Sequence, residues 1–436
     1  MKRAICLILS VLLLCAAPLG LAGCGAQPGP AATPEQPAEH PEQTGTSQVA
    51  DLMKGIAAHT PAADVDLTAG SVRLADFAVR LFRAANEEGK NTLVSPLSVM
   101  YALAMTANGA REETLAQMET VLGMKAEELN RYLCAYGRSL AGDEFGRLDL
   151  ANSIWFTQDD SFQVNADFLQ TNADYYGADI YQAPFTQETC RAINDWVKEK
   201  TRGMIPEILD RIPSEAVMYL VNALAFEAEW VEPYRENAVR EGEFTREDGG
   251  RDTAEFLYAR ENSYLETDNA TGFIKYYKGG RYAFAALLPR EGVTAAELVS
   301  SLSGEALHQL LADPEIVPVD TAMPKFETRF STELSQVLTE MGMPLAFDGD
   351  RADFTALGRA DENIYISRVL HKTFISVAEQ GTRAGAATVV EMAKNTAFMP
   401  PEEIKTVFLD RPFVYMLVDC DTQTPFFLGT MMDVNG

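Results

Sequence analysis

The sequence predicts an α+β domain, and three observations indicate that class. Apolar residues recur every three or four positions over residues 74–85, which is typical of a helix with one buried face. Between residues 244 and 289, strand-like runs flank Gly279-Gly280, a hairpin signal. No proline interrupts residues 345–399, so every residue there keeps a backbone N–H that a sheet can use. The chain therefore supplies both helices and strands for one mixed core.

The composition suits a large folded protein and argues against nucleic-acid binding. The chain has 436 residues, of which 47% are hydrophobic and 23% charged, enough for one large core or two domains. Its 63 acidic and 36 basic residues give a net charge of -27, which disfavours contact with a phosphate backbone. Such a charge fits a protein that works outside the cell or near a cationic target.

The N-terminus is typical of a targeting segment. Lys2 and Arg3 precede an apolar run over residues 4–17, which is shorter than a bilayer span. The following Leu21-Ala22-Gly23-Cys24 resembles the signal of bacterial lipoproteins. This resemblance implies that the Cys24 thiol is lipidated and becomes the new N-terminus, whereas the alternative is an ordinary secretory peptide.

The targeting segment sets the expected division of the chain. We expect a lipoprotein-type signal peptide over residues 1–23 and a lipidated, proline-rich tether over residues 24–65, because the tether composition cannot bury a core. The folded domain is expected over residues 66–436. The protein would then be extracellular, anchored to the membrane at the cell surface through Cys24.

Residues for the common enzyme chemistries are sparse. Beyond the tether, Cys134, Cys190 and Cys420 are far apart and show neither metal-ligand spacing nor a disulfide framework. The chain has four histidines, and no Gly-x-Ser-x-Gly, His-x-x-x-His, Cys-x-x-Cys or phosphate-loop motif accompanies them. We therefore expect no catalytic site, no metal site and no cofactor.

Polar residues within apolar stretches have structural interpretations. Ser95 directly precedes Pro96, so Ser95 is expected to cap a helix rather than to act as a nucleophile. Residues 363–379 are predicted to form a long strand that contains His371. A lone histidine in a strand is more often a hydrogen-bonded core residue than a catalyst.

Small side chains mark the stretch that follows this strand. Counting by two places Thr382, Ala384, Ala386 and Thr388 on one face, where they are small enough to slide beneath other elements. These residues offer little apolar surface, so we expect that the stretch does not become ordered by itself. The pattern therefore predicts two states, an exposed loop and an inserted strand. A flexible linker between domains is the alternative interpretation.

The same stretch resembles the hinge of the serpin family. That hinge has Glu, one residue, Gly, Thr or Ser, one residue, and then small residues up to a Thr. The matching residues here are Glu379, Gly381, Thr382, Ala384, Gly385, Ala386, Ala387 and Thr388. Arg383 stands where Glu is usual, at an outward-facing position. Further landmarks in the family's order extend the resemblance over residues 71–434.

This resemblance implies a fold and a mechanism. The serpin fold has three β-sheets, about nine helices and an exposed reactive-centre loop. A serine protease, or a cysteine protease, would attack the loop and form an acyl-enzyme. The cut loop would then insert into the main sheet before water releases the protease. The residues that match the family's shutter, beneath the central strands, are Ser95, Ser98, Asn222 and His371.

The family's spacing predicts the reactive bond. The seventeenth residue counted from Glu379 is Asn395, so the predicted bond is Asn395-Thr396. Lys394 would instead attract a trypsin-like protease, and Met392 would suit an elastase-like pocket. The predicted function is therefore inhibition of a serine protease, with an elastase-like target. The alternative is a non-inhibitory binding or chaperone protein with the serpin fold.

A polysaccharide cofactor is not expected. Some serpins bind heparin through a basic helix, but residues 125–147 contain four basic and four acidic residues in mixed order. Mixed charge of this kind does not form a basic stripe. We therefore expect no heparin binding, and we expect a monomer.

Overall fold

The computed structural model describes residues 49–59, 61, 65–140, 146–213, 216–382 and 404–435. These residues belong to one compact unit, Thr46–Gly436. Within them, no helix has both the length and the apolar character that a bilayer crossing requires. The predicted signal peptide and Cys24 lie outside the described residues, so the lipid anchor stays a prediction.

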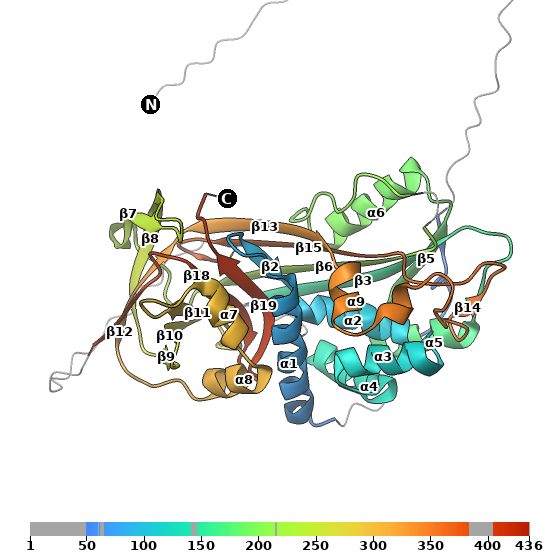
Figure 1. The fold of residues 1–436 in the computed structure, drawn as a ribbon, viewed down its shortest axis with the longest axis horizontal. Coiled ribbons are helices and arrows are strands. Elements are labelled where there is room, and N and C mark those ends of the chain that lie inside the picture. The colour runs from blue at the N-terminus through green and yellow to red at the C-terminus, as the bar shows by residue number, and fades with distance from the viewer. Residues whose placement is uncertain are drawn as a thin grey trace, which may run out of the picture. The chain divides into compact units, whose positions relative to one another are not determined.

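The main sheet has seven strands and extends across the molecule (Figure 1). In spatial order they are β1 (Ala50–Asp51), β5 (Asp179–Ala183), β3 (Gly146–Thr157), β6 (Met218–Glu229), β16 (Gly381–Thr382), β15 (Arg368–Val377) and β13 (Phe326–Glu333). β3 and β6 pair antiparallel over nearly their whole lengths, whereas β6 and β15 pair in parallel. β6 is buried on both faces, as a central strand covered on two sides must be.

Three more sheets are present among the described residues. The six-stranded sheet contains β2 (Thr92–Val94), β19 (Thr424–Met431), β18 (Phe413–Asp419), β11 (Tyr282–Pro289), β10 (Ala270–Tyr276) and β9 (Tyr264–Glu266). The four-stranded sheet contains β17 (Lys405–Phe408), β12 (Val319–Pro324), β8 (Arg251–Glu261) and β7 (Val239–Thr245). A short ribbon joins β4 (Gln163–Val164) to β14 (Gly358–Arg359). The three predicted sheets are thus confirmed, and the ribbon is an addition to them.

Nine α-helices occur in the described part of the chain, as predicted. They are α1 (Leu67–Ala85), α2 (Pro96–Ala107), α3 (Glu112–Leu122), α4 (Ala126–Ser139), α5 (Ala166–Tyr176), α6 (Gln187–Lys200), α7 (Ala295–Ser301), α8 (Gly304–Ala312) and α9 (Ser335–Glu340). Two 3-10 turns, Glu236–Ala238 and Pro344–Phe347, complete the helical elements. α1 begins at Leu67, before the predicted apolar run, because the Asp66 carboxylate accepts a hydrogen bond from Thr68 N and caps the helix.

The core lies on both faces of the main sheet. On one face α6 covers the sheet, and its Ile193 and Val197 belong to a cluster with Tyr219 and Val221 of β6 (Figure 1). On the other face β6 contributes Leu220 and other residues to a larger cluster that includes α1 and α2. Alternate residues of one strand therefore stabilise two separate layers. The predicted hairpin is confirmed, because β10 and β11 pair antiparallel.

The end of the predicted tether is part of the fold. Ala50 and Asp51 pair with Gln182 and Tyr181 of β5, and Leu52 N donates to the Ile180 carbonyl. The boundary predicted at residue 66 is therefore too late, because the edge of the main sheet offers unpaired backbone groups that the tether satisfies. Composition alone does not reveal this pairing, since Ala and Asp are poor strand formers.

Candidate functional site: the loop hinge and the shutter

The hinge enters the main sheet between two central strands. Gly381 and Thr382 of β16 pair antiparallel with Glu229 and Ala228 of β6, and Thr382 also pairs with Val377 of β15. Further along, β6 and β15 pair directly with each other. Among the described residues, the position between these strands is therefore occupied at one end only, by the hinge.

Gly381 is held where no larger residue fits. A Cβ atom at this position would lie 2.0 Å from the Ala228 carbonyl oxygen and 2.8 Å from Glu229 Cα. Both of these neighbours are backbone atoms of β6, which cannot rotate away. The glycine of the predicted hinge therefore permits the close approach of the hinge to β6.

Thr382 faces inward, as the count by two predicts. It is 1% exposed, and its Oγ1 shares a hydrogen bond with the Tyr277 hydroxyl. The Tyr277 ring stacks on Trp230 with 4.2 Å between ring centres. Burial raises the pKa of Tyr277, so its hydroxyl keeps the proton that this hydrogen bond needs. A small polar residue is thus well suited to this position.

Glu379 forms an ion pair across the strands. Its carboxylate lies 2.8 Å from Lys325 Nζ, which also lies 2.8 Å from a carboxylate oxygen of Glu255. Burial is the largest single influence and opposes ionisation of Glu379, but the hydrogen bond and charge of Lys325 together with a backbone hydrogen bond outweigh it and lower the pKa of this carboxyl. The hinge turn is therefore fixed by an ionised side chain at its start and by Thr382 at its end.

The rest of the predicted loop lies outside the described residues. This holds for the hinge positions Ala384, Gly385, Ala386, Ala387 and Thr388, and for the reactive-bond candidates Met392, Lys394, Asn395 and Thr396. Their assignments stay predictions. The chain is described again from Ile404, directly before β17, which pairs in parallel with β12.

The four predicted shutter residues come together beneath the central strands. Asn222 on β6 and His371 on β15 are register partners, and His371 Nδ1 lies 2.6 Å from Asn222 Oδ1. Ser98 Oγ donates to the same Asn222 oxygen at 3.1 Å. Ser95 N donates to His371 Nε2 at 3.0 Å, and Ser95 Oγ caps α2 by accepting from Ser98 N. These contacts join both central strands to the start of one helix.

His371 is neutral in this network. Complete burial lowers its pKa from 6.5 to about 3. Because the Ser95 N–H donates to Nε2, the ring hydrogen must be on Nδ1, where it is donated to Asn222. A neutral, fully engaged imidazole holds two strands together and is poorly placed for proton transfer to a substrate. The shutter role itself stays a prediction.

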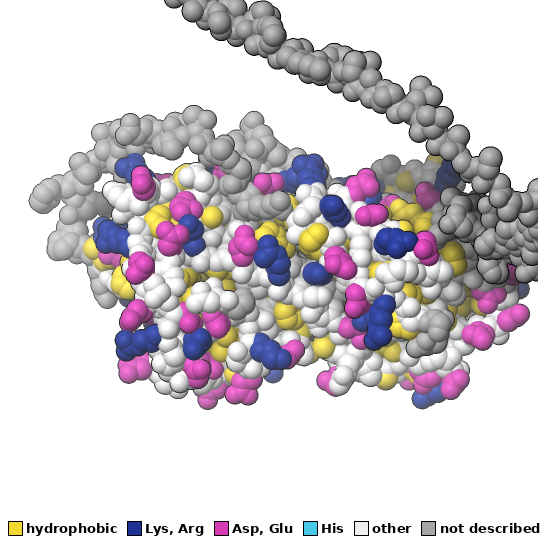
Figure 2. Space-filling model, turned by 90° about the horizontal axis from the view of Figure 1, so that it is seen from above, with side chains coloured by type: hydrophobic (Ala, Val, Ile, Leu, Met, Phe, Trp, Pro, Cys, Tyr) yellow, Lys and Arg dark blue, Asp and Glu magenta, His cyan; other side chains and the backbone are white. Residues whose placement is uncertain are grey.

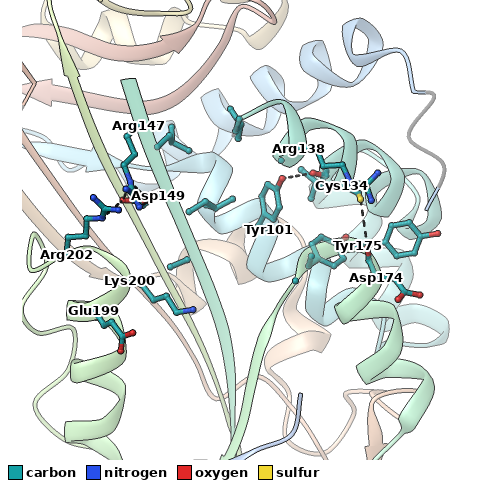
Figure 3. Close-up of a pocket in the computed structure, with 18 residues that line it drawn as sticks. Tyr101, Cys134, Arg138, Arg147, Asp149, Asp174, Tyr175, Glu199, Lys200 and Arg202 are labelled. Atoms are coloured by element: carbon teal, nitrogen blue, oxygen red, sulfur yellow. Dashed lines mark hydrogen bonds and ion pairs between the residues drawn. The ribbon is translucent and has the colours of Figure 1, made fainter. Parts of the chain in front are cut away.

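A cavity of about 730 Å³ lies elsewhere, between β3, α4, α5 and α6 (Figure 3). Arg147 on its wall donates through Nε to both carboxylate oxygens of Asp149 at 2.7 Å, and Arg202 lies 3.6 Å from the same carboxylate. Its charges are thus partly neutralised within the wall. No hinge or shutter residue lines this cavity, so it is separate from the candidate site.

The surface has no dominant sign of charge on the face shown in Figure 2. Acidic and basic side chains of the described residues are interspersed there. On and before α4, Lys125 pairs with Glu119 and Arg131 pairs with Glu127. Paired charges of this kind do not attract a polyanion strongly. The structure thus offers no argument for a heparin site at this helix.

Sequence reasoning missed the partners of the hinge. Trp230 Nε1 donates to the Ala378 carbonyl, and Trp230 N donates to the Gln380 carbonyl. Trp230, Tyr277 and Lys325 were not among the predicted site residues. Their contacts with the hinge come from strands far away in the sequence, and no local spacing signals such a contact. The opposite charges of Lys325 and Glu379 were the one available hint.

Comparison with known proteins identifies the family. The family model described as "Serpin (serine protease inhibitor)" matches residues 73–434. The chain belongs to the serpin family. An uncharacterized serpin-like protein of Thermococcus kodakarensis is 31% identical over 82% of this chain and 84% of its own length. The leukocyte elastase inhibitor of Sus scrofa is 30% identical over 81% of this chain and 97% of its own length.

Solved structures confirm the serpin fold and bear on its state. Tengpin, a thermophilic serpin, is 44% identical, and its native-state crystal structure superposes with a TM-score of 0.84 over 88% of this chain and 100% of tengpin. Tengpin in the latent state gives 0.75 over 85% of this chain and 99% of that structure. The structure of this serpin is therefore more similar to tengpin in its native state than to tengpin in its latent state.

Proposed function

We propose that this serpin is a suicide inhibitor of a serine protease. The observation that carries the proposal is the hinge, because Gly381 and Thr382 already lie between β6 and β15 while β6 and β15 pair directly further along. A cleaved loop that continued from Thr382 would become a full central strand. The similarity to a leukocyte elastase inhibitor supports an elastase-like target.

The driving force is the unfinished sheet. Each inserted residue adds ladder hydrogen bonds worth about 1 kcal/mol net, so insertion of ten residues contributes on the order of 10 kcal/mol. The inserting strand must separate β6 from β15 over residues 368–373, where the two strands pair directly. The inserted strand then pairs with both β6 and β15. The hydrogen bonds lost between β6 and β15 are therefore replaced by new ones on each side of the inserted strand.

The chemical step is an acyl transfer that stops at the acyl-enzyme. The protease serine attacks the carbonyl carbon of the scissile residue, which we assign to Asn395, and the amine of Thr396 leaves. The resulting ester would normally be hydrolysed by water. Insertion of the loop displaces the attached protease before hydrolysis and distorts its active site. Trapping therefore depends on insertion being faster than hydrolysis.

The test is to mix the purified protein with elastase-like and trypsin-like serine proteases. A complex that survives boiling in detergent is expected, together with a released C-terminal peptide that begins at Thr396 by mass spectrometry. Release after Lys394 or Met392 would move the reactive bond without affecting the mechanism. Cleavage of the loop without a stable complex would contradict inhibition and favour a non-inhibitory binding protein.

We also propose that the mature protein is attached to the outer surface of a membrane through lipidated Cys24. The anchor should be lost in a Cys24→Ser variant, because only a thiol can carry the thioether-linked lipid. We expect this variant in the soluble fraction after cell fractionation, whereas the wild-type protein stays with the membranes. A Cys134→Ser variant is the matched control and should remain membrane-bound. Membrane association that persists without Cys24 would refute the anchor.

A further inference from the structure

A buried lysine lies beside the hinge. Lys275 is on β10, and its side chain is 3% exposed. Its Nζ lies 2.8 Å from a carboxylate oxygen of Glu261 and donates to the Glu232 carbonyl at 3.2 Å. A lysine is seldom buried unless it is paired, because removal of its charge from water is costly. The fold therefore keeps a cation at this place against a considerable desolvation penalty.

Two aromatic rings complete the surroundings of this ammonium. Lys275 Nζ lies 4.5 Å from the centre of the Tyr234 ring and 5.4 Å from the centre of the Trp230 ring. Both rings are buried, so the cation–π attraction acts in a desolvated setting where it is strongest. Lys275 thus attracts both ends of the segment between Trp230 and Tyr234.

The same two residues also bind the hinge turn. Trp230 Nε1 donates to the Ala378 carbonyl at 2.9 Å. Tyr234 N donates to the Glu379 carbonyl at 2.8 Å, and Trp230 N donates to the Gln380 carbonyl at 2.9 Å. Three successive carbonyls of the turn are therefore bound by the two residues that contact the Lys275 ammonium. No direct contact between Lys275 and the hinge is needed for coupling.

We propose that Lys275 is a positioning residue for loop insertion. This role rests on the proposed inhibitory function. By fixing Trp230 and Tyr234, the ammonium keeps the hinge turn seated between β6 and β15. The new strand then extends from Thr382, which is already paired with β6 and β15. The entropic cost of bringing the first residues of the loop to these strands is therefore avoided.

The role predicts a specific kinetic effect. After acylation, insertion and hydrolysis compete for the same intermediate, and their ratio sets how many serpin molecules are consumed for each protease trapped. A less firmly seated hinge slows insertion but leaves the attack of the protease on the loop unchanged. Lys275 should therefore affect the stoichiometry of inhibition and not the rate of loop cleavage.

The experiment compares full-length variants with the wild-type protein. Each is mixed with the same trypsin-like or elastase-like protease, chosen because the wild-type protein traps it. Lys275→Met removes the ammonium and keeps the length of the side chain. We expect the ratio of hydrolysis to insertion to rise about thirtyfold, because a desolvated cation–π contact contributes about 2 kcal/mol, and the stoichiometry of inhibition rises with this ratio. Lys275→Arg keeps a cation and should restore most of the wild-type value. The rate constant of loop cleavage should be the same in all variants.

The matched control is Arg260→Met. Arg260 is the residue next to Glu261 on β8 and pairs with Asp320 at 2.7 Å, but its side chain is 56% exposed. Removal of this exposed cation should leave the stoichiometry unchanged. If Lys275→Met caused only a general loss of folding stability, its melting temperature would fall, and Lys275→Arg would not selectively restore the stoichiometry of inhibition. The two readouts therefore separate positioning from a merely structural role.

An unchanged stoichiometry for Lys275→Met would overturn the role of Lys275 while leaving the proposed function intact. If this variant does not fold, Glu261→Gln takes its place, because it removes the carboxylate that orients the ammonium. A rise in the stoichiometry of Glu261→Gln supports the role, and no rise overturns it. Absence of a stable complex with the wild-type protein would instead refute the proposed function, and this role with it.

Discussion

A Thr382→Arg variant should be cleaved by the target protease without trapping it. Thr382 is 1% exposed and lies between β6 and β15, so an arginine there would have to bury its charge for the loop to insert. Burial of an unpaired charge costs several kcal/mol, and about 3 kcal/mol slows a step by about a hundredfold. We expect insertion to lose the competition with hydrolysis. The measurement is the ratio of detergent-stable complex to cleaved serpin.

Two controls make this prediction specific. Thr382→Ser keeps the small hydroxyl that meets Tyr277 and should trap protease as the wild type does. Thr406→Arg makes the same change at an exposed position of β17, and it should also leave trapping unchanged. Full trapping by Thr382→Arg would contradict insertion along the path that the hinge marks.

The stability of the native state should fall steeply as the pH drops below 6.5. The folded pKa of His371 is about 3, whereas its ordinary value is 6.5. Between these values the unfolded chain binds a proton that the folded chain excludes, so acid favours unfolding by about 1.4 kcal/mol per pH unit. Above pH 6.5 the histidine is neutral in both states, and its contribution is fully present.

The pH dependence is measured from urea unfolding of the native state at pH 7, 6 and 5. A His371→Gln variant lacks the titrating group and should show a smaller slope than the wild type over this range. His308→Gln is the matched control, because its imidazole is half-buried near Ser71 and the Thr422 carbonyl, away from the shutter. Equal slopes for the wild type and His371→Gln would show that His371 does not account for acid sensitivity.

Local pattern predicted the fold class and single elements, whereas the three sheets and about nine helices came from the family resemblance. The apolar face of α1 could be predicted from residue 74 onward, because helical periodicity depends only on residues three and four positions apart. The inward position of Thr382 followed from the alternation of side chains along a strand. The shutter residues came from family resemblance, since nothing in their local sequence brings Asn222 and His371 together.

Other features depend on contacts between distant segments and could not be predicted. Lys275 occurs in an apolar strand, where a charged residue suggests exposure, yet Glu261 and two aromatic rings keep it buried. Ala50 and Asp51 form a strand only because β5 offers a free edge. In both cases the partner's position decides the structure, and that position is a property of the whole fold.

The most direct test of the account is thermal melting before and after the loop is cut within residues 383–403. If the native protein stores free energy in an unfinished main sheet, the cut loop should insert and the melting temperature should rise by about 15 °C or more. Circular dichroism of intact and nicked protein gives both values, and Thr382→Arg should show a smaller rise. An unchanged melting temperature after complete cleavage of the wild-type loop would contradict the account.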